Sequence, residues 1–167
     1  SDITEAHLDT FFEFYIDTGS RKWGSPYLTR KTFSLLRERM ADDLLFIFAY
    51  EGNTAIAGAM NLIGSDTLYG RYWGTLDQRP MLHFETCYYQ GIDYCLREGL
   101  TRLEPGAQGE HKIDRGFLPS FVRSRHWLAD ADFAAALSGW CREEAEAVAR
   151  YAAEMATHSP FRTGDRG

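Results

Sequence analysis

The sequence has little cysteine, and its three cysteines follow no recognised metal or disulfide pattern. Cys87, Cys95 and Cys141 form no CxxC pair. An odd number of cysteines without metal-ligand spacing predicts reduced, mostly buried thiols, as is typical of a cytoplasmic protein. His83 and Cys87 stand one helical turn apart, but no zinc spacing accompanies them, so we expect no metal site.

Long apolar runs and an excess of positive charge are also missing. No stretch approaches the roughly 20 apolar residues that a membrane-spanning helix needs, and the first five residues lack the basic start and apolar run of a signal peptide. The net charge is −6, with 18 basic and 24 acidic residues. We therefore expect no membrane span, and nucleic-acid binding by this chain alone is disfavoured because it needs a basic face.

Apolar and aromatic residues, in contrast, are plentiful. Hydrophobic residues make up 44% and aromatic residues 14% of 167 positions, which suits a single domain with one core spanning residues 1–167. Periodicity predicts helices over 4–18, about 29–40, 82–98 and 130–157. Alternation and apolar runs predict strands over 44–50, 54–63, 67–73, 101–104 and 121–128.

The order of these elements predicts the fold class. Short turns join the first three strands, which indicates an antiparallel meander. We expect an α/β (α+β) fold with a mixed, mostly antiparallel sheet flanked by helices. Asp2 and Glu5 fit a capping box for the first helix. The last helix is predicted to bury an apolar stripe made of Phe133, Leu137, Trp140, Cys141, Val148, Tyr151 and Met155.

A glycine-containing polar turn after the strand at 101–104 is the densest candidate for an anion-binding site. Gly106 and Gly109 permit tight turns that expose backbone N–H groups. Gln108, Lys112 and Arg115 add hydrogen-bond donors and positive charge. Together they could hold a phosphate, a carboxylate or an oxyanion. From composition alone, a solvated loop with locally paired charges is favoured by roughly two to one.

The same region supplies candidate proton acceptors. Glu110 and His111 are candidate general bases for an amine nucleophile. Glu104 ends the preceding strand, where a side chain can face a cleft and a partly buried carboxyl has a raised pKa. The alternative, equally weighted, is that Glu104 forms an ion pair with Arg102 or Arg123.

The start of the helix at 82–98 provides further candidates. His83 and Glu85 lie at its N-terminus, where exposed N–H groups bind anions; Glu85 is equally explained as a residue that stabilises the helix dipole. Arg71 lies in an aromatic strand segment, and its guanidinium can hold a carboxylate or phosphate by two parallel hydrogen bonds.

Several strings together resemble one family. They are FY at 14–15, WGSPYL at 23–28, GRYWG at 70–74, HFETCYYQGIDYC at 83–95, GAQGEHK at 106–112 and RGFLP at 115–119. The chain resembles, over nearly its whole length, the FemAB-like group labelled peptidoglycan biosynthesis/recognition. That resemblance implies a GNAT (acyl-CoA N-acyltransferase) fold and kinship with Fem ligases, which move aminoacyl groups from tRNA onto an amine of the peptidoglycan precursor.

The resemblance also implies a longer protein. Family members usually have two GNAT-like lobes, and this chain looks like the C-terminal one, so an N-terminal lobe of the same protein is an expected partner, and a homodimer is compatible. The stretch 75–82 departs from GNAT enzymes that bind acetyl-CoA, because it has no glycine and contains Pro80, which lacks a donor. An acyl-CoA donor held in the usual manner is therefore disfavoured, and an aminoacyl-tRNA donor stays open.

Two functional hypotheses follow. The first is an acyl- or aminoacyl-transferase domain acting on an amine acceptor such as a peptidoglycan precursor. The second is a non-catalytic domain that recognises a cell-wall peptide or glycan. The ionisable residues after Glu104 favour the first hypothesis, and the missing phosphate loop favours the second.

Overall fold

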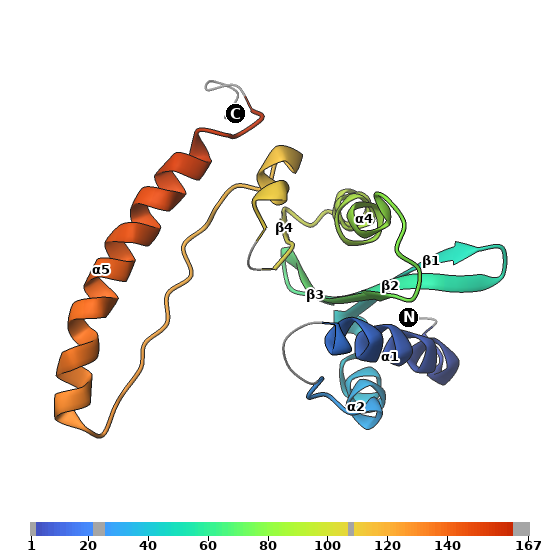
Figure 1. The fold of residues 1–167 in the computed structure, drawn as a ribbon. Coiled ribbons are helices and arrows are strands. Elements are labelled where there is room, and N and C mark those ends of the chain that lie inside the picture. The colour runs from blue at the N-terminus through green and yellow to red at the C-terminus, as the bar shows by residue number, and fades with distance from the viewer. Residues whose placement is uncertain (1–2, 22–25, 107–108, 162–167) are drawn as a thin grey trace. The chain divides into compact units, whose positions relative to one another are not determined.

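The computed structural model describes residues 3–21, 26–106 and 109–161 (Figure 1). The chain divides into two compact units, residues 1–107 and 108–167. The first unit holds the sheet and the helices around it. The second contains a short helical turn, an extended segment and one long helix.

The first unit is built on a four-stranded sheet in the order β1-β2-β3-β4. The strands are β1 (Leu44–Glu51), β2 (Thr54–Ile63), β3 (Thr67–Thr75) and β4 (Arg102–Glu104). The first three form an antiparallel meander, and β4 pairs parallel with β3. The predicted class, a mixed and mostly antiparallel sheet flanked by helices, is confirmed.

Helices cover both faces of this sheet (Figure 1). α1 (Glu5–Ser20) and α2 (Arg30–Met40) lie on one face. A continuous helical stretch lies on the other and consists of α3 (Leu82–Phe84), a π-helical turn (Glu85–Tyr89) and α4 (Gln90–Glu98). The predicted central helix over 82–98 is therefore confirmed, although its first half is not regular α-helix.

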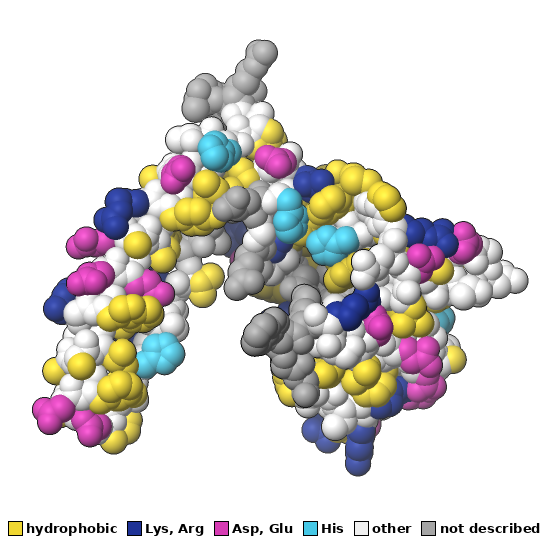
Figure 2. Space-filling model, viewed as in Figure 1, with side chains coloured by type: hydrophobic (Ala, Val, Ile, Leu, Met, Phe, Trp, Pro, Cys, Tyr) yellow, Lys and Arg dark blue, Asp and Glu magenta, His cyan; other side chains and the backbone are white. Residues whose placement is uncertain are grey.

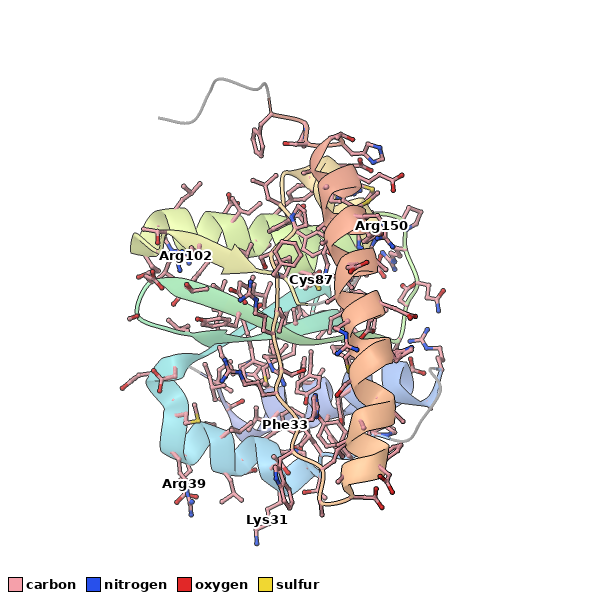
Figure 3. The ribbon with its side chains drawn as sticks, turned by 90° about the vertical axis from the view of Figure 1, so that its left-hand side faces the viewer. Lys31, Phe33, Arg39, Cys87, Arg102 and Arg150 are labelled. Atoms are coloured by element: carbon pink, nitrogen blue, oxygen red, sulfur yellow. The ribbon has the colours of Figure 1, made fainter. Side chains whose placement is uncertain are left out.

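The core lies between α1, α2 and the sheet. Its buried members are Leu8, Phe11, Tyr15, Phe33 and Met60. Phe11 meets Phe33 edge-on, with ring centroids 5.6 Å apart. Figure 3 shows Phe33 on the inner side of α2, whereas Lys31 and Arg39 of the same helix point away from the sheet. Apolar burial therefore attaches both helices to the sheet.

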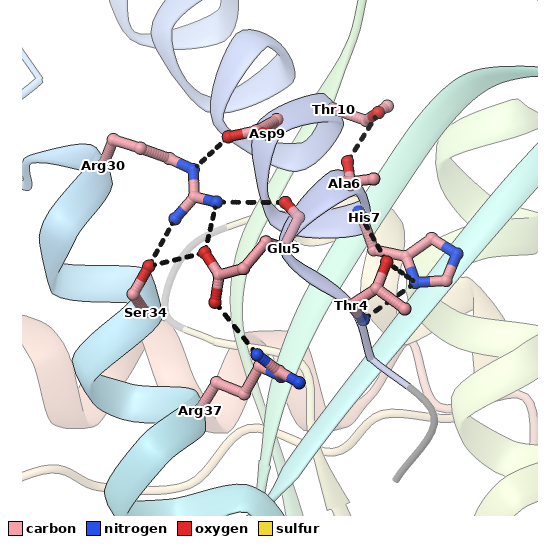
Figure 4. Close-up of polar contacts among 9 residues, drawn as sticks. All are labelled: Thr4, Glu5, Ala6, His7, Asp9, Thr10, Arg30, Ser34 and Arg37. Carbon is pink, nitrogen blue, oxygen red and sulfur yellow. Dashed lines mark hydrogen bonds and ion pairs between the residues drawn. The ribbon is translucent and has the colours of Figure 1, made fainter.

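The N-terminal cap of α1 differs from the predicted one. Thr4 is the N-cap, and its hydroxyl accepts a hydrogen bond from the His7 backbone N–H at 3.3 Å. The His7 ring accepts one from the Thr4 backbone at 3.1 Å, which completes a capping box (Figure 4). The capping box predicted for Asp2 and Glu5 is wrong, because the helix begins one residue after Thr4, and Asp2 lies outside the described residues.

Glu5 instead joins α1 to α2 (Figure 4). Its carboxylate accepts hydrogen bonds from Arg30 at 2.8 Å and Arg37 at 3.0 Å. Arg30 also donates to Asp9 at 2.7 Å. The hydrogen bond from Arg30 lowers the pKa of Glu5. This network fixes the two helices relative to each other at the surface.

The second unit contains a 3₁₀ turn, η3 (Glu110–Arg115), and α5 (Ala131–Ala156). Ile113 and Met155 are its buried apolar residues among those described. The predicted strand over 121–128 is wrong, because this segment is extended but pairs with no described strand. The alternating sequence gives the segment two faces. A β-strand also needs a neighbouring strand that forms hydrogen bonds with its backbone N–H and C=O groups.

Within the second unit, the described residues do not bury most members of the predicted α5 apolar stripe. Phe133, Trp140 and Val148 are exposed, and Cys141 is exposed rather than buried. Figure 2 shows apolar side chains along this helix at the surface. Helical periodicity defines an apolar face but does not supply the element that covers it.

Candidate functional site

Arg71 occupies a β-bulge. Asn61 of β2 pairs with Gly70, and its neighbour Met60 pairs with Tyr72, so Arg71 is the extra residue on β3. A bulge bends the strand and changes the direction of a side chain, and bulges are common beside active sites. Arg71 is exposed and has no ion pair with any described residue.

The parallel pairing of β3 with β4 ends beside this bulge. The last register pair joins Tyr69 to Glu104. The backbone at the end of β4 lies close to Gly70, since a Cβ atom at Gly70 would lie 3.4 Å from the Glu104 carbonyl oxygen. Beyond that point, residues 71–75 have β2 on one side and no described strand on the other. We call residues 71–75 the open half of β3.

Glu104 lies at the other side of this junction. Its side chain is exposed, and no described cation forms an ion pair with it. Arg102, one of the two partners considered from the sequence, lies 3.9 Å from Asp66 instead. An exposed carboxylate and an exposed guanidinium therefore stand on neighbouring parallel strands where β4 ends. Opposite charges in this position can bind a ligand that carries both an amine and an anion.

The helix start beside the open half of β3 is irregular. Met81 has φ of +66°, which among the described residues is found at no other non-glycine position, and the π-helical turn follows it. Left-handed residues and π-helical turns concentrate at functional sites. The His83 ring packs on Trp73 of β3, with centroids 5.0 Å apart, and on Tyr88 at 5.2 Å. His83 is thus held at the edge of the open half by aromatic neighbours.

Glu85 has a local partner. Its carboxylate accepts a hydrogen bond from Gln90 at 2.8 Å, one π-helical turn further on. This contact agrees with the stabilising interpretation of Glu85, and the substrate-binding roles predicted for Glu85 and His83 stay predictions.

A tyrosine cluster lies next to Arg71 and was given no role in the sequence analysis. The hydroxyl groups of Tyr27 and Tyr72 are 2.6 Å apart. The Arg71 guanidinium carbon lies 5.6 Å from the Tyr72 ring centroid, and the Tyr15 ring meets Tyr72 at 5.2 Å. No spacing in the sequence reveals this cluster, because Tyr27 and Tyr72 are 45 residues apart.

The polar turn predicted to carry chemistry falls largely in the second unit. His111 is exposed, and Lys112 is half-buried. The Arg115 Nη1 donates to the His111 carbonyl oxygen at 2.6 Å. Gln108 and the side chain of Glu110 lie outside the described residues. The roles predicted for these five residues stay predictions.

The segment between β3 and α3 is held by its own side chains. The Thr75 hydroxyl accepts from the Asp77 backbone N–H at 3.0 Å. Arg79 donates to both carboxylate oxygens of Glu51 at 2.8 Å and pairs with Asp77 at 2.6 Å. Arg79, the one cation between β3 and α3, is therefore already paired with carboxylates.

The Glu51–Arg79 pair gives a measurable pH effect. Hydrogen bonds from Arg79 lower the pKa of Glu51. A lowered folded-state pKa contributes stability above the unfolded-state pKa, and that contribution is lost as the pH falls through the folded-state pKa. We expect Arg79→Ala to raise the Glu51 pKa toward its ordinary value in an NMR titration of carboxyl carbons. Arg97→Ala, which removes a partner of Glu98 instead, should leave the Glu51 pKa unchanged. An unaltered Glu51 pKa in Arg79→Ala would contradict the pairing.

The described residues also bear on two other classes of function, metal binding and membrane spanning. No group of three or more His, Cys, Asp or Glu side chains is placed to hold a metal ion in the described part of the chain. Within the same residues, the helices lack the combination of length and apolarity required to cross a bilayer.

Comparison with known protein families agrees with the mixed sheet and its flanking helices. Residues 1–163 match the model of the FemAB-like family, described as peptidoglycan biosynthesis/recognition. No curated protein matches the chain. The match spans nearly all of the chain, and a GNAT placement is consistent with it. The mixed sheet, the helices on both its faces and this match together identify the chain as a member of the FemAB-like family, with a role related to peptidoglycan.

Proposed function

We propose that the chain is an acyl- or aminoacyl-transferase domain that modifies an amine of a peptidoglycan precursor. The observation that carries the proposal is the pair of exposed charges, Glu104 and Arg71, where the parallel strands β3 and β4 part; neither forms an ion pair with a described residue. The family's peptidoglycan-related role supports the acceptor class. Precursors of this kind are cytoplasmic molecules, so a cytoplasmic location belongs to the proposal.

The proposed chemistry assigns one role to each charge. Glu104 takes a proton from the neutral acceptor amine as its nitrogen attacks the acyl carbonyl carbon. A C–N bond forms, and a tetrahedral oxyanion results. The intermediate collapses with breakage of the bond to the donor's oxygen or sulfur, and the leaving group takes up the proton. Arg71 holds an anionic group of the acceptor and so orients the amine.

The segment that precedes the central helix indicates which acyl donor the protein uses. Because Arg79 is paired with Glu51 and Asp77, the usual position for a CoA pyrophosphate has no spare cation. An aminoacyl ester of tRNA is therefore the favoured donor, with acyl-CoA as the second choice. Because the chain has a net charge of −6, it is poorly suited to bind the tRNA phosphate backbone. We propose that an N-terminal lobe of the same protein binds the tRNA.

The alternative function is recognition without transfer. The segment around Arg79 favours it, because the pairs described above offer no donor-phosphate site there. A recognition domain would bind the precursor at the same two charges and would return it unmodified. Turnover separates the two functions.

The decisive experiment measures amino-acid addition to a precursor. The protein is incubated with a UDP-linked muramyl pentapeptide that contains lysine and with either aminoacyl-tRNA or acetyl-CoA, and mass spectrometry detects the added group. We expect addition from aminoacyl-tRNA, and a rate reduced by about 10²-fold or more in Glu104→Gln, because general bases contribute on that scale. Glu13→Gln, an exposed carboxylate on α1, is the matched control and should retain the wild-type rate.

The outcomes are distinct. Loss of turnover in Glu104→Gln with normal precursor binding supports the transferase. Binding of the precursor without addition from either donor would support the recognition function and refute the transferase. Equal rates in Glu104→Gln and the wild type would remove Glu104 from the mechanism.

A further inference from the structure

Arg71, Tyr27 and Tyr72 together form a small donor cluster on β3 and the segment before α2. Tyr27 is 74% exposed, whereas Tyr72 is half-buried. The Arg71 guanidinium lies over the Tyr72 ring, and its charge reaches the Tyr72 phenol closely enough to oppose the rise of that pKa. The cluster thus presents a positioned guanidinium beside a pair of hydroxyl groups.

One of the two O–H groups of the tyrosine pair can still donate a hydrogen bond to a ligand. At 2.6 Å one hydroxyl donates to the other, and each phenol has a single O–H group. The second hydroxyl therefore keeps its hydrogen for another acceptor. The Tyr15 hydroxyl, beside them, already accepts a hydrogen bond from the Leu28 backbone N–H at 3.2 Å.

Arg71 supplies the positive charge of the cluster, because a guanidinium stays protonated in proteins. Burial, together with the hydrogen bond to Tyr27, raises the pKa of Tyr72 to about 12, so that this phenol stays neutral. A carboxylate matches this charge and presents acceptor positions for two guanidinium N–H groups and one phenol O–H. A diphosphate would place two or more negative charges near the Glu104 carboxylate, which lies opposite Tyr69 in the strand register, and would be repelled by it.

We propose that Arg71 and the Tyr27–Tyr72 pair bind the free C-terminal carboxylate of a peptide acceptor. This inference rests on the proposed function and names its substrate class, a short peptide with both an amine and a terminal carboxylate. From strand spacing and rise, the Cα atoms of Arg71 and Glu104 are roughly 8 Å apart. One short peptide can therefore reach both residues, with its carboxylate at Arg71 and its amine at Glu104.

Binding of a defined peptide tests the inference. The probe is Nα-acetyl-L-lysyl-D-alanyl-D-alanine, compared with the same peptide as its C-terminal amide, by isothermal titration calorimetry on the full chain. We expect the amide to bind about 10- to 100-fold more weakly to the wild type, since hydrogen bonds to charged groups contribute on that scale. Arg71→Ala should lose the same factor for the free acid and should not distinguish acid from amide.

Three further variants make the test specific. Arg71→Lys keeps the charge but not the two parallel donors, and it should fall between the wild type and Arg71→Ala. The double variant Tyr27→Phe/Tyr72→Phe removes the spare O–H whichever tyrosine carries it, so it should weaken binding of the acid by a few-fold and leave binding of the amide unchanged. Arg39→Ala, which removes an exposed cation of α2 (Figure 3), controls for net charge and should behave as the wild type.

The results distinguish this inference from the proposed function. If Arg71→Ala still prefers acid over amide by the wild-type factor, the carboxylate site is refuted whether or not the protein transfers an acyl group. If acid is preferred through Arg71 but no transfer occurs with any donor, the inference stands and the transferase fails.

Discussion

Gly74→Ala is expected to destabilise the first unit by at least about 4 kcal/mol, an exceptional value for one methyl group. A Cβ atom at Gly74 would lie 2.2 Å from the Phe14 carbonyl oxygen and 2.5 Å from the carbonyl carbon. Phe14 is 1% exposed and belongs to α1. The methyl group therefore meets helix backbone that no side-chain rotation can move, and α1 must separate from β3 to admit it.

Urea denaturation followed by circular dichroism measures this effect. Gly99→Ala is the control, because Gly99 has φ of +72° but no heavy atom within 4 Å of the added Cβ. Its expected penalty is about 1–2 kcal/mol, from backbone strain alone. If Gly74→Ala is no more destabilised than Gly99→Ala, then α1 does not approach β3 as closely as described. If Gly74→Ala gives no folded protein under conditions in which Gly99→Ala folds, that difference also supports the close approach of α1 to β3.

Local chemistry accounts for the elements that the sequence predicts well. The strands predicted over 44–50, 54–63 and 67–73 correspond to β1, β2 and β3, with ends displaced by at most two residues. Turn residues Gly52 and Asn53 separate the first two strands, and the polarity of Gly64-Ser65-Asp66 ends the second. Short connections leave adjacent strands no arrangement except antiparallel pairing. The sheet on which the candidate site depends was therefore predictable.

Contacts distant in sequence account for what was missed. The sequence predicts a strand at 101–104 but not that it pairs parallel to β3 and ends opposite Tyr69. The bulge at Arg71 depends on the register against β2, which no local pattern sets. Arg71 was singled out for its chemistry, whereas Tyr27 and Tyr72 meet only after α1 and α2 pack on the sheet. The site is thus a product of register and packing.

The segment at 121–128 and α5 mark the limit of pattern-based prediction. The segment alternates as a strand should, yet no described strand pairs with it. The stripe on α5 has helical spacing, yet Trp140 is 57% exposed. A period identifies one face of an element, and burial depends on a second surface that the sequence of that element does not encode.

Phe11→Ala is expected to destabilise the first unit by about 3–5 kcal/mol, as is typical for removal of a buried aromatic ring. Phe11 is fully buried, and its ring meets those of Phe33 at 5.6 Å, Phe46 at 5.0 Å and Phe48 at 6.4 Å, all edge-on. These neighbours come from α2 and β1, so the cavity opens where three elements meet. Close packing there limits how far the neighbours can relax to fill it.

Truncation of Phe11 should weaken ligand binding at the candidate site as well as lower the stability of the fold. Tyr15 packs on Phe33 at 5.5 Å and on Tyr72 at 5.2 Å, so a cavity at Phe11 loosens the support of the Tyr27–Tyr72 pair. We expect the milder variant Phe11→Leu to fold and to bind the lysyl-D-alanyl-D-alanine probe a few-fold more weakly. Ile16→Ala, which truncates a 39% exposed residue of α1, should change neither stability by more than about 1 kcal/mol nor peptide affinity. A Phe11→Leu protein with reduced stability but wild-type affinity would show that the tyrosine pair is held independently of the core.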